Sequence, residues 1–149
     1  MVERAAERNP AASYDAYGGD RLPYDDASFD VVFSICVLHH VPLSSRAGFT
    51  AELRRVTRPG GLVMIGEHNP YNPMTRLIVY RCAFDEDAVL LRATEVESLL
   101  RGAGLETLER RYILVLPSDA RPLRRLERAL SSTPAGAQYI AVARRPAGE

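Results

Sequence analysis

Residues 22–41 read LPYDDASFDVVFSICVLHHV, in which a turn-rich loop leads into a nearly continuous apolar run. The run, residues 29–38, is rich in β-branched side chains and is followed directly by two histidines, His39 and His40. A strand that helices cover on both faces has this composition, as in a parallel sheet. The stretch therefore predicts a buried strand whose carboxyl end carries a pair of imidazoles.

Residues 52–67 read ELRRVTRPGGLVMIGE and predict the end of a helix followed by a second buried strand. The helix is expected to begin before this stretch, because apolar residues recur at helical spacing from Phe49 to Val56. Ser44 or Ser45 is its candidate N-cap. The Pro-Gly-Gly sequence at 59–61 is expected to stop the helix and to lead into the strand at 62–67.

In the rest of the chain, predicted strands and predicted helices continue to alternate. Thr94 and Glu97 have the spacing of a capping box, and the leucines at 123, 126 and 130 give a later helix an apolar face. Strands alternating with helices indicate an α/β sheet with right-handed crossovers, in one domain spanning residues 1–149. We expect further strands at 13–17, 105–117 and 137–145, and further helices at 2–9, 74–82, 94–100 and 120–132.

Composition limits the functional class. The formal net charge is zero, so no general attraction to nucleic acid or to an anionic membrane is expected. The longest nearly uncharged run, residues 31–43, is too short to span a membrane, and residues 1–8 lack the apolar segment of a signal peptide. Cys36 and Cys82 form no disulfide framework. The sequence predicts a soluble cytoplasmic domain with no nucleic-acid partner and no membrane span.

The two quoted stretches together resemble the class I S-adenosylmethionine-dependent methyltransferases. They are most similar to the methyltransferase type 11 branch, which contains ubiquinone and menaquinone C-methyltransferases. That branch shows LPF-x-x-x-SFD-x-V before its fourth strand and an LRPGG turn before its fifth. The resemblance is close over residues 22–67, and the order of elements is compatible to Val142. It implies a partial Rossmann-like fold, a mostly parallel sheet with helices on both faces and strand order 3-2-1-4-5-7-6.

The resemblance also implies that a strand–helix–strand unit would precede Met1, because the family's glycine-rich loop and the acidic end of its second strand have no counterpart here. The strand expected at 13–17 would then either pair directly with the strand at 29–38 or leave an apolar edge open. We expect this chain by itself to be poorly stable and to bind S-adenosylmethionine weakly or not at all.

Cofactor contacts are implied by the resemblance, because ligands of such sheets bind beyond the carboxyl ends of the strands. The family usually has an acidic residue four positions before the Leu of LPF. Here that position is Gly18, and Asp20 is the candidate substitute. The candidate cofactor-binding residues come after the strand at 13–17 and from the carboxyl end of the strand at 29–38 onward: Gly18, Gly19, Asp20, Arg21, Leu22, Ser34, Ile35, Cys36 and His39.

The histidine pair has three possible roles. Zinc sites use spacings such as C-x₂-C or H-x₃-H, which this sequence lacks, and adjacent residues point apart on a strand or helix, so no metal site is predicted. One imidazole could act as a general base near pH 7, or the pair could only stabilise the turn. Glu67 and His68 follow the second strand and could take a proton from a hydroxyl nucleophile, or residues 67–82 could form a stiff loop. The candidate catalytic residues are His40, Glu67 and His68.

The resemblance implies methyl transfer to a small-molecule acceptor such as a quinone, a lipid or a sugar-linked intermediate. Arg76, Arg81 and Asp85 are either contacts for a polar substrate or solvated charges. A non-catalytic remnant or interaction module is the alternative, favoured by the absent glycine-rich loop. A nucleotide-binding oxidoreductase is disfavoured, because no G-x-G-x-x-G follows a strand.

Overall fold

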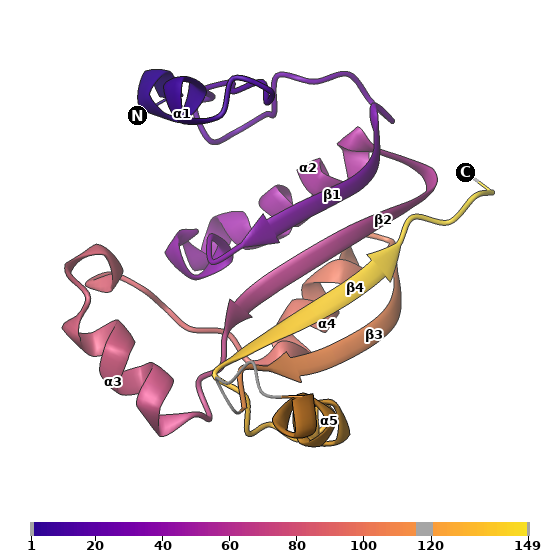
Figure 1. Cartoon of the computed structure of the whole chain (residues 1–149). Coiled ribbons are helices and arrows are strands. Elements are labelled where there is room, and N and C mark those ends of the chain that lie inside the picture. The colour runs from indigo at the N-terminus through magenta and orange to yellow at the C-terminus, as the bar shows by residue number, and fades with distance from the viewer. Residues whose placement is uncertain (1, 116–120, 149) are drawn as a thin grey trace.

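The computed structural model describes residues 2–115 and 121–148, and its centre is a four-stranded sheet with strand order β1-β2-β4-β3 (Figure 1). β1 pairs with β2 in parallel, and β4 is antiparallel to both of its neighbours, so β1, β2 and β3 run in the same direction. This order matches the last four positions of the order that the resemblance implied. The strands are β1 (Phe29–Ile35), β2 (Thr57–His68), β3 (Glu106–Ile113) and β4 (Gln138–Arg144).

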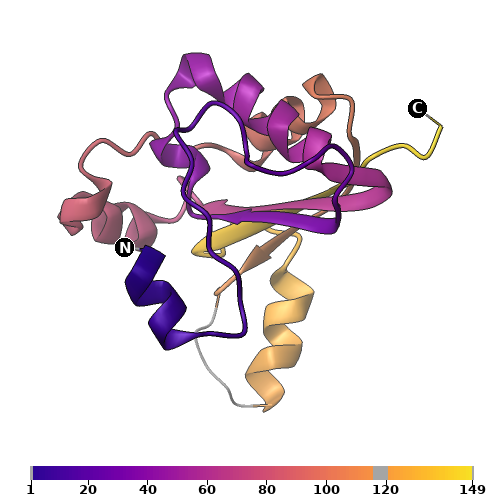
Figure 2. The same cartoon turned by 90° about the horizontal axis from the view of Figure 1, so that it is seen from above.

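Helices lie where the sequence predicts them, on both sides of the sheet. Figure 2 shows α2 and α4 above the sheet and α1 and α5 below it. The side chains of Leu123 and Leu126, and residues 116–117 of the expected third strand, lie outside the described part of the chain. The helices are α1 (Val2–Arg8), α2 (Arg46–Val56), α3 (Pro73–Arg81), α4 (Ala93–Gly102) and α5 (Arg121–Leu130), with short 3₁₀ turns η1 (Leu38–His40), η2 (Leu43–Ser45) and η3 (Ala83–Asp85).

The core lies between the sheet and the α2–α4 layer. Strand side chains alternate between the two faces of a sheet, and the set that points toward α2 and α4 is almost fully buried. Burial of these apolar side chains is the main stabilising contribution to the fold. The core includes Leu53, Val63, Ile65, Val96, Leu100, Tyr139, Ala141 and Ala143.

β1 is a sheet edge with an exposed apolar face, which corrects two expectations. Residues 13–17 form no strand and nearly all of their side chains are exposed, so nothing packs to hold them in an extended pairing. β1 is also not buried on both faces, because Val31, Phe33 and Ile35 are 52%, 64% and 54% exposed. Of the two outcomes expected for this region, the open apolar edge is the one found.

Three local expectations change in detail. The capping box of α4 lies two residues earlier than predicted, since Glu95 Oε2 accepts from the Arg92 N–H at 2.6 Å. Ser45 occupies the N-cap of α2 but makes no side-chain capping bond. α2 ends at Val56, so the Pro-Gly-Gly sequence lies inside β2, where Gly61 lies against β1. The described helices include none that is both long and apolar enough to cross a bilayer.

Candidate functional site

The carboxyl ends of β1 and β2 meet at one edge of the sheet, where the chain turns sharply after each strand. Cys36 follows β1 with a φ of +53°, and η1 then carries the two histidines back over the strand end. β2 ends beside it with Glu67 and His68. The parallel pairing of two strands therefore brings the candidate site residues Cys36, His39, His40, Glu67 and His68 to one edge of the sheet.

Glu67 is the buried centre of this edge, with 1% of its surface exposed. Its Oε1 accepts from the backbone N–H groups of Val37 at 3.1 Å and Leu38 at 2.7 Å. Its Oε2 lies 2.5 Å from Nδ1 of His39. Three hydrogen bonds thus compensate the burial of the carboxylate, and all three fix the turn after β1.

His39 is also buried and lies between two carboxylates. Its Nδ1 contacts Glu67, and its Nε2 lies 3.5 Å from Oδ1 of Asp85. Burial by itself would lower the pKa of His39, but the hydrogen bond that the ring donates to Glu67 and the charges of Glu67 and Asp85 outweigh it and leave the pKa raised. A positive charge on this ring is therefore stabilised from both sides.

His40 reaches the same aspartate. Its Nε2 lies 3.3 Å from Asp85 Oδ1, and the His39 and His40 ring centroids are 4.2 Å apart. The expectation that adjacent histidines point apart is wrong here, because η3 places Asp85 against η1 and both rings turn toward the shared carboxylate. The His40 side chain is 40% exposed, whereas that of Asp85 is 14% exposed, so His40 is the accessible imidazole of the pair.

His68 completes the group, with its ring centroid 5.2 Å from that of His39. Burial lowers the pKa of His68, and the neighbouring His39 lowers it further. Below we call Glu67, His39, His40, Asp85 and His68 the histidine–carboxylate cluster.

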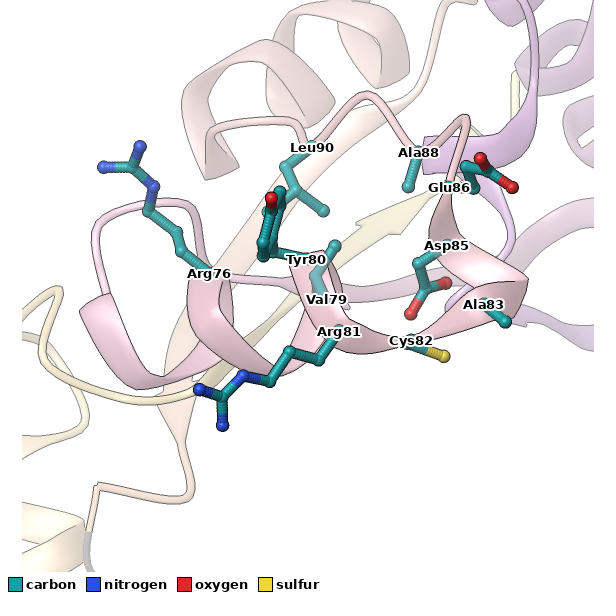
Figure 3. A pocket seen from close by; sticks show the side chains of 10 residues that line it. All are labelled: Arg76, Val79, Tyr80, Arg81, Cys82, Ala83, Asp85, Glu86, Ala88 and Leu90. Carbon is teal, nitrogen blue, oxygen red and sulfur yellow. The ribbon is translucent and has the colours of Figure 1, made fainter.

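A cavity of about 720 Å³ lies between α3 and η3, directly beside this cluster. Asp85 lines it and is also the residue that contacts both histidines. In Figure 3, Asp85 points toward α3, and the guanidinium groups of Arg76 and Arg81 extend outward. The full lining is Arg76, Val79, Tyr80, Arg81, Cys82, Ala83, Asp85, Glu86, Ala88 and Leu90.

A second hollow of about 610 Å³ runs along β1 and the loop before it, and we call it the β1 groove. Leu22, Ser34 and Ile35 line it, together with uncharged side chains that are mostly apolar. The Ser34 Oγ is buried and has no hydrogen-bond partner. These three of the candidate cofactor-binding residues thus line one hollow.

The other predicted cofactor residues lie elsewhere. Gly18, Gly19, Asp20 and Arg21 are exposed in the loop before Leu22 and do not line the groove. Cys36 Sγ faces Gln138 Nε2 at 3.5 Å, and His39 belongs to the histidine–carboxylate cluster.

Two residues that position the β1 groove were not predicted. Glu52 Oε2 accepts from the Leu22 N–H at 3.0 Å, and Arg55 donates to the carbonyls of Leu22 and Tyr24. Their spacing of three residues on a helix was the available signal, since it lets Glu52 and Arg55 pair while facing the same loop.

Comparison with known proteins gives one family. Residues 1–65 match the family model described as "Methyltransferase domain". The chain is 39% identical over 127 residues to the 27-O-demethylrifamycin SV methyltransferase of Amycolatopsis mediterranei, covering 71% of this chain and 42% of that protein. It is 35% identical over 79 residues to the demethylmenaquinone methyltransferase of Beutenbergia cavernae, covering 52% and 32%. The chain thus spans less than half the length of these relatives.

A solved structure shares the fold. The S-adenosylmethionine-dependent methyltransferase from Thermotoga maritima, described as a possible histamine N-methyltransferase, aligns with a TM-score of 0.70 at 19% identity, covering 96% of this chain and 70% of that one. The strand order, the sequence blocks at 22–41 and 52–67 and these matches agree, and together they support a class I methyltransferase.

Proposed function

We propose that this chain takes part in S-adenosylmethionine-dependent methyl transfer to a hydroxyl group of a small molecule held in the cavity between α3 and η3. The observation that carries the proposal is Asp85, which lines the cavity and contacts both imidazoles of the cluster. The names of the relatives support the reaction class, since one methylates a demethylrifamycin oxygen and another a demethylmenaquinone.

His40 is the proton acceptor in this proposal. It is the exposed imidazole of the pair, and a neutral imidazole suits proton removal near pH 7. The imidazolium that results is stabilised by Asp85 at 3.3 Å. Glu67 and His39 are positioning residues, because Glu67 directs its oxygens to the turn and to His39 and not to the cavity. His68 is a second, less exposed candidate base.

The β1 groove fits part of the cofactor. Its apolar lining suits the adenine ring, and the unpartnered Ser34 Oγ can bond a polar edge of that ring. The lining side chains carry no charge, so the groove supplies no ionic partner for the amino and carboxylate groups of the methionine part. The bound cofactor would supply an electrophilic methyl group on a sulfonium. The chain's own contribution is to hold the acceptor and to take its proton.

Two measurements test the proposal. Calorimetric titration of the chain with S-adenosylmethionine should show weak or no binding, and micromolar binding would contradict the fit just described. Transfer is then measured in a chimera that places the N-terminal part of the Amycolatopsis relative before residue 1, with hydroquinones and hydroxylated aromatic compounds as acceptors. Methylated product detected by mass spectrometry should fall about 100-fold in His40→Gln. The matched control, Asp87→Asn on an exposed side chain, should keep full activity.

The open edge of β1 favours a second function, that of an interaction module. Val31, Phe33 and Ile35 present an apolar row on an unpaired edge strand, which is a surface that binds other chains. A chimera that binds the cofactor but yields no methyl product with any acceptor would support this alternative over transfer.

A further inference from the structure

We propose that His39, His40 and Asp85 form a binding site for a divalent transition-metal ion of the Zn²⁺ class. The Nε2 atoms of His39 and His40 lie 3.5 and 3.3 Å from Asp85 Oδ1, and the three atoms are all within 4.8 Å of one another. Zinc–nitrogen and zinc–oxygen bonds of 2.0–2.2 Å in a tetrahedron place neighbouring ligand atoms about 3.3–3.6 Å apart. Both contacts to Asp85 already have this length.

His39 is oriented as metal-binding histidines are. Such a histidine almost always donates its second ring N–H to a carboxylate or carbonyl, which fixes the tautomer and the ring direction. Here Nδ1 of His39 lies 2.5 Å from Glu67 Oε2, and Glu67 is itself fixed by two backbone N–H groups. With its proton on Nδ1, the neutral ring directs the Nε2 lone pair toward Asp85, an arrangement that favours a positive charge between the two atoms, either a proton on Nε2 or a metal ion.

The charges of the cluster match a divalent ion. Glu67 and Asp85 bring two carboxylates into a site where their side chains are 1% and 14% exposed. One ion of charge +2 would neutralise both. Protonating His39 and His40 together would instead gather positive charge on rings 4.2 Å apart, with His68 at 5.2 Å from His39.

The site has an entry path and room for a fourth ligand. His40 is 40% exposed, and Asp85 opens onto the cavity between α3 and η3. Three protein ligands and one open position define the catalytic type of zinc site, in contrast to the closed structural type. Two imidazole ligands disfavour Mg²⁺ and Ca²⁺, which prefer oxygen.

Metal binding here needs neither the cofactor nor an acceptor, so it can be measured separately from the proposed methyl transfer. An ion bound to His40 Nε2 would occupy the atom that accepts the proton in that proposal, so the two roles exclude each other at the same moment. No metal-ligand spacing is visible in the sequence, because Asp85 comes from a distant turn and only the fold brings it to the histidines.

The test uses the full chain after removal of metals with a chelator. Titration with CoCl₂ should give the visible absorption of tetrahedral cobalt, saturating at one ion per chain, and Zn²⁺ should displace it. Absence of a saturable signal would overturn the site.

Variants locate the ion. His40→Gln and Asp85→Asn should each weaken Co²⁺ binding at least tenfold, and Asp87→Asn, an exposed aspartate of the same segment, should leave it unchanged. Circular dichroism and unfolding midpoints confirm that each variant is folded. Because His40 is partly exposed, its variant remains informative if Asp85→Asn unfolds. Equal binding by His40→Gln and Asp87→Asn, or loss of binding only in Cys82→Ser, would contradict the assignment.

Discussion

Oε2 of Glu67, at the end of β2, lies 2.5 Å from Nδ1 of His39, in the turn after β1. Both side chains are almost fully buried, and Glu67 also holds the backbone of that turn through Val37 and Leu38. One carboxylate thus fixes the path of the chain between the two strands and the tautomer of the imidazole. The stability of the fold and the chemistry of the edge depend on the same residue.

Replacing Glu67 with Gln should therefore lower the free energy of unfolding by about 3 kcal/mol, because it removes the charge from a buried, hydrogen-bonded pair. The amide also turns one acceptor into a donor that opposes the N–H of His39. Denaturant unfolding followed by circular dichroism measures the change.

The control for Glu67 is Glu86→Gln, which changes an exposed glutamate and should alter stability by no more than about 0.5 kcal/mol. Equal effects of the two substitutions would mean that the buried pair contributes nothing specific.

The sequence predicts this edge of the sheet well and its contacts poorly. Strands β1 and β2 are visible as apolar runs, and the helices through spacing and caps, because these signals are local. His39, Glu67 and His68 were all candidates, yet their pairing depends on two strands lying side by side. Asp85 was read as a substrate contact or a solvated charge, since no motif connects it to the histidines. The strand expected at 13–17 was wrong because alternation without a surface to bury does not hold a strand.

Acidic pH should destabilise the loop that lines the β1 groove, because it protonates Glu52, which accepts a hydrogen bond from that loop. The hydrogen bond from Arg55 holds the pKa of Glu52 below its ordinary value of 4.5, against a smaller opposing effect of burial. A pKa lowered by folding means that the ionised form stabilises the fold. This contribution is complete above the ordinary value and is lost as the pH falls through the lowered one.

Unfolding curves from pH 6 to pH 3 should thus show a steeper loss of stability in the wild-type chain than in Glu52→Gln, which lacks the titrating group. Glu106→Gln, on an exposed side chain, should follow the wild type. Parallel curves for all three chains would rule out a role for Glu52.

The exposed apolar row of Val31, Phe33 and Ile35 on β1 should cause self-association, and introducing one charged side chain there should reduce it. Phe33 is 64% exposed in the middle of this row, so Phe33→Lys removes apolar surface without opening the core. We expect lower light scattering and weaker binding of an apolar dye, with unfolding free energy changed by no more than about 0.5 kcal/mol. Phe84→Lys makes the same change at a side chain 91% exposed on η3. If Phe84→Lys reduced scattering as much as Phe33→Lys, general charge and not the β1 row would be responsible.

Replacing Gly61 or Gly48 with alanine should have opposite effects on stability, because Gly61 lies where two strands pack closely and Gly48 lies in a helix with open space around it. A Cβ on Gly61 would lie 2.8 Å from the Asp30 carbonyl oxygen and from Thr57 Cγ2, so Gly61→Ala must push β2 away from β1. We expect it to destabilise the fold by about 1–3 kcal/mol. Gly48 lies inside α2 with no atom within 4 Å of its Cβ position, and Gly48→Ala should stabilise the fold by about 0.5–1 kcal/mol, since alanine loses less backbone entropy in a helix. Thermal unfolding of the two variants should therefore shift the midpoint in opposite directions. A rise in the thermal unfolding midpoint of Gly61→Ala would mean that β1 and β2 lie farther apart at this point than they do in the structure.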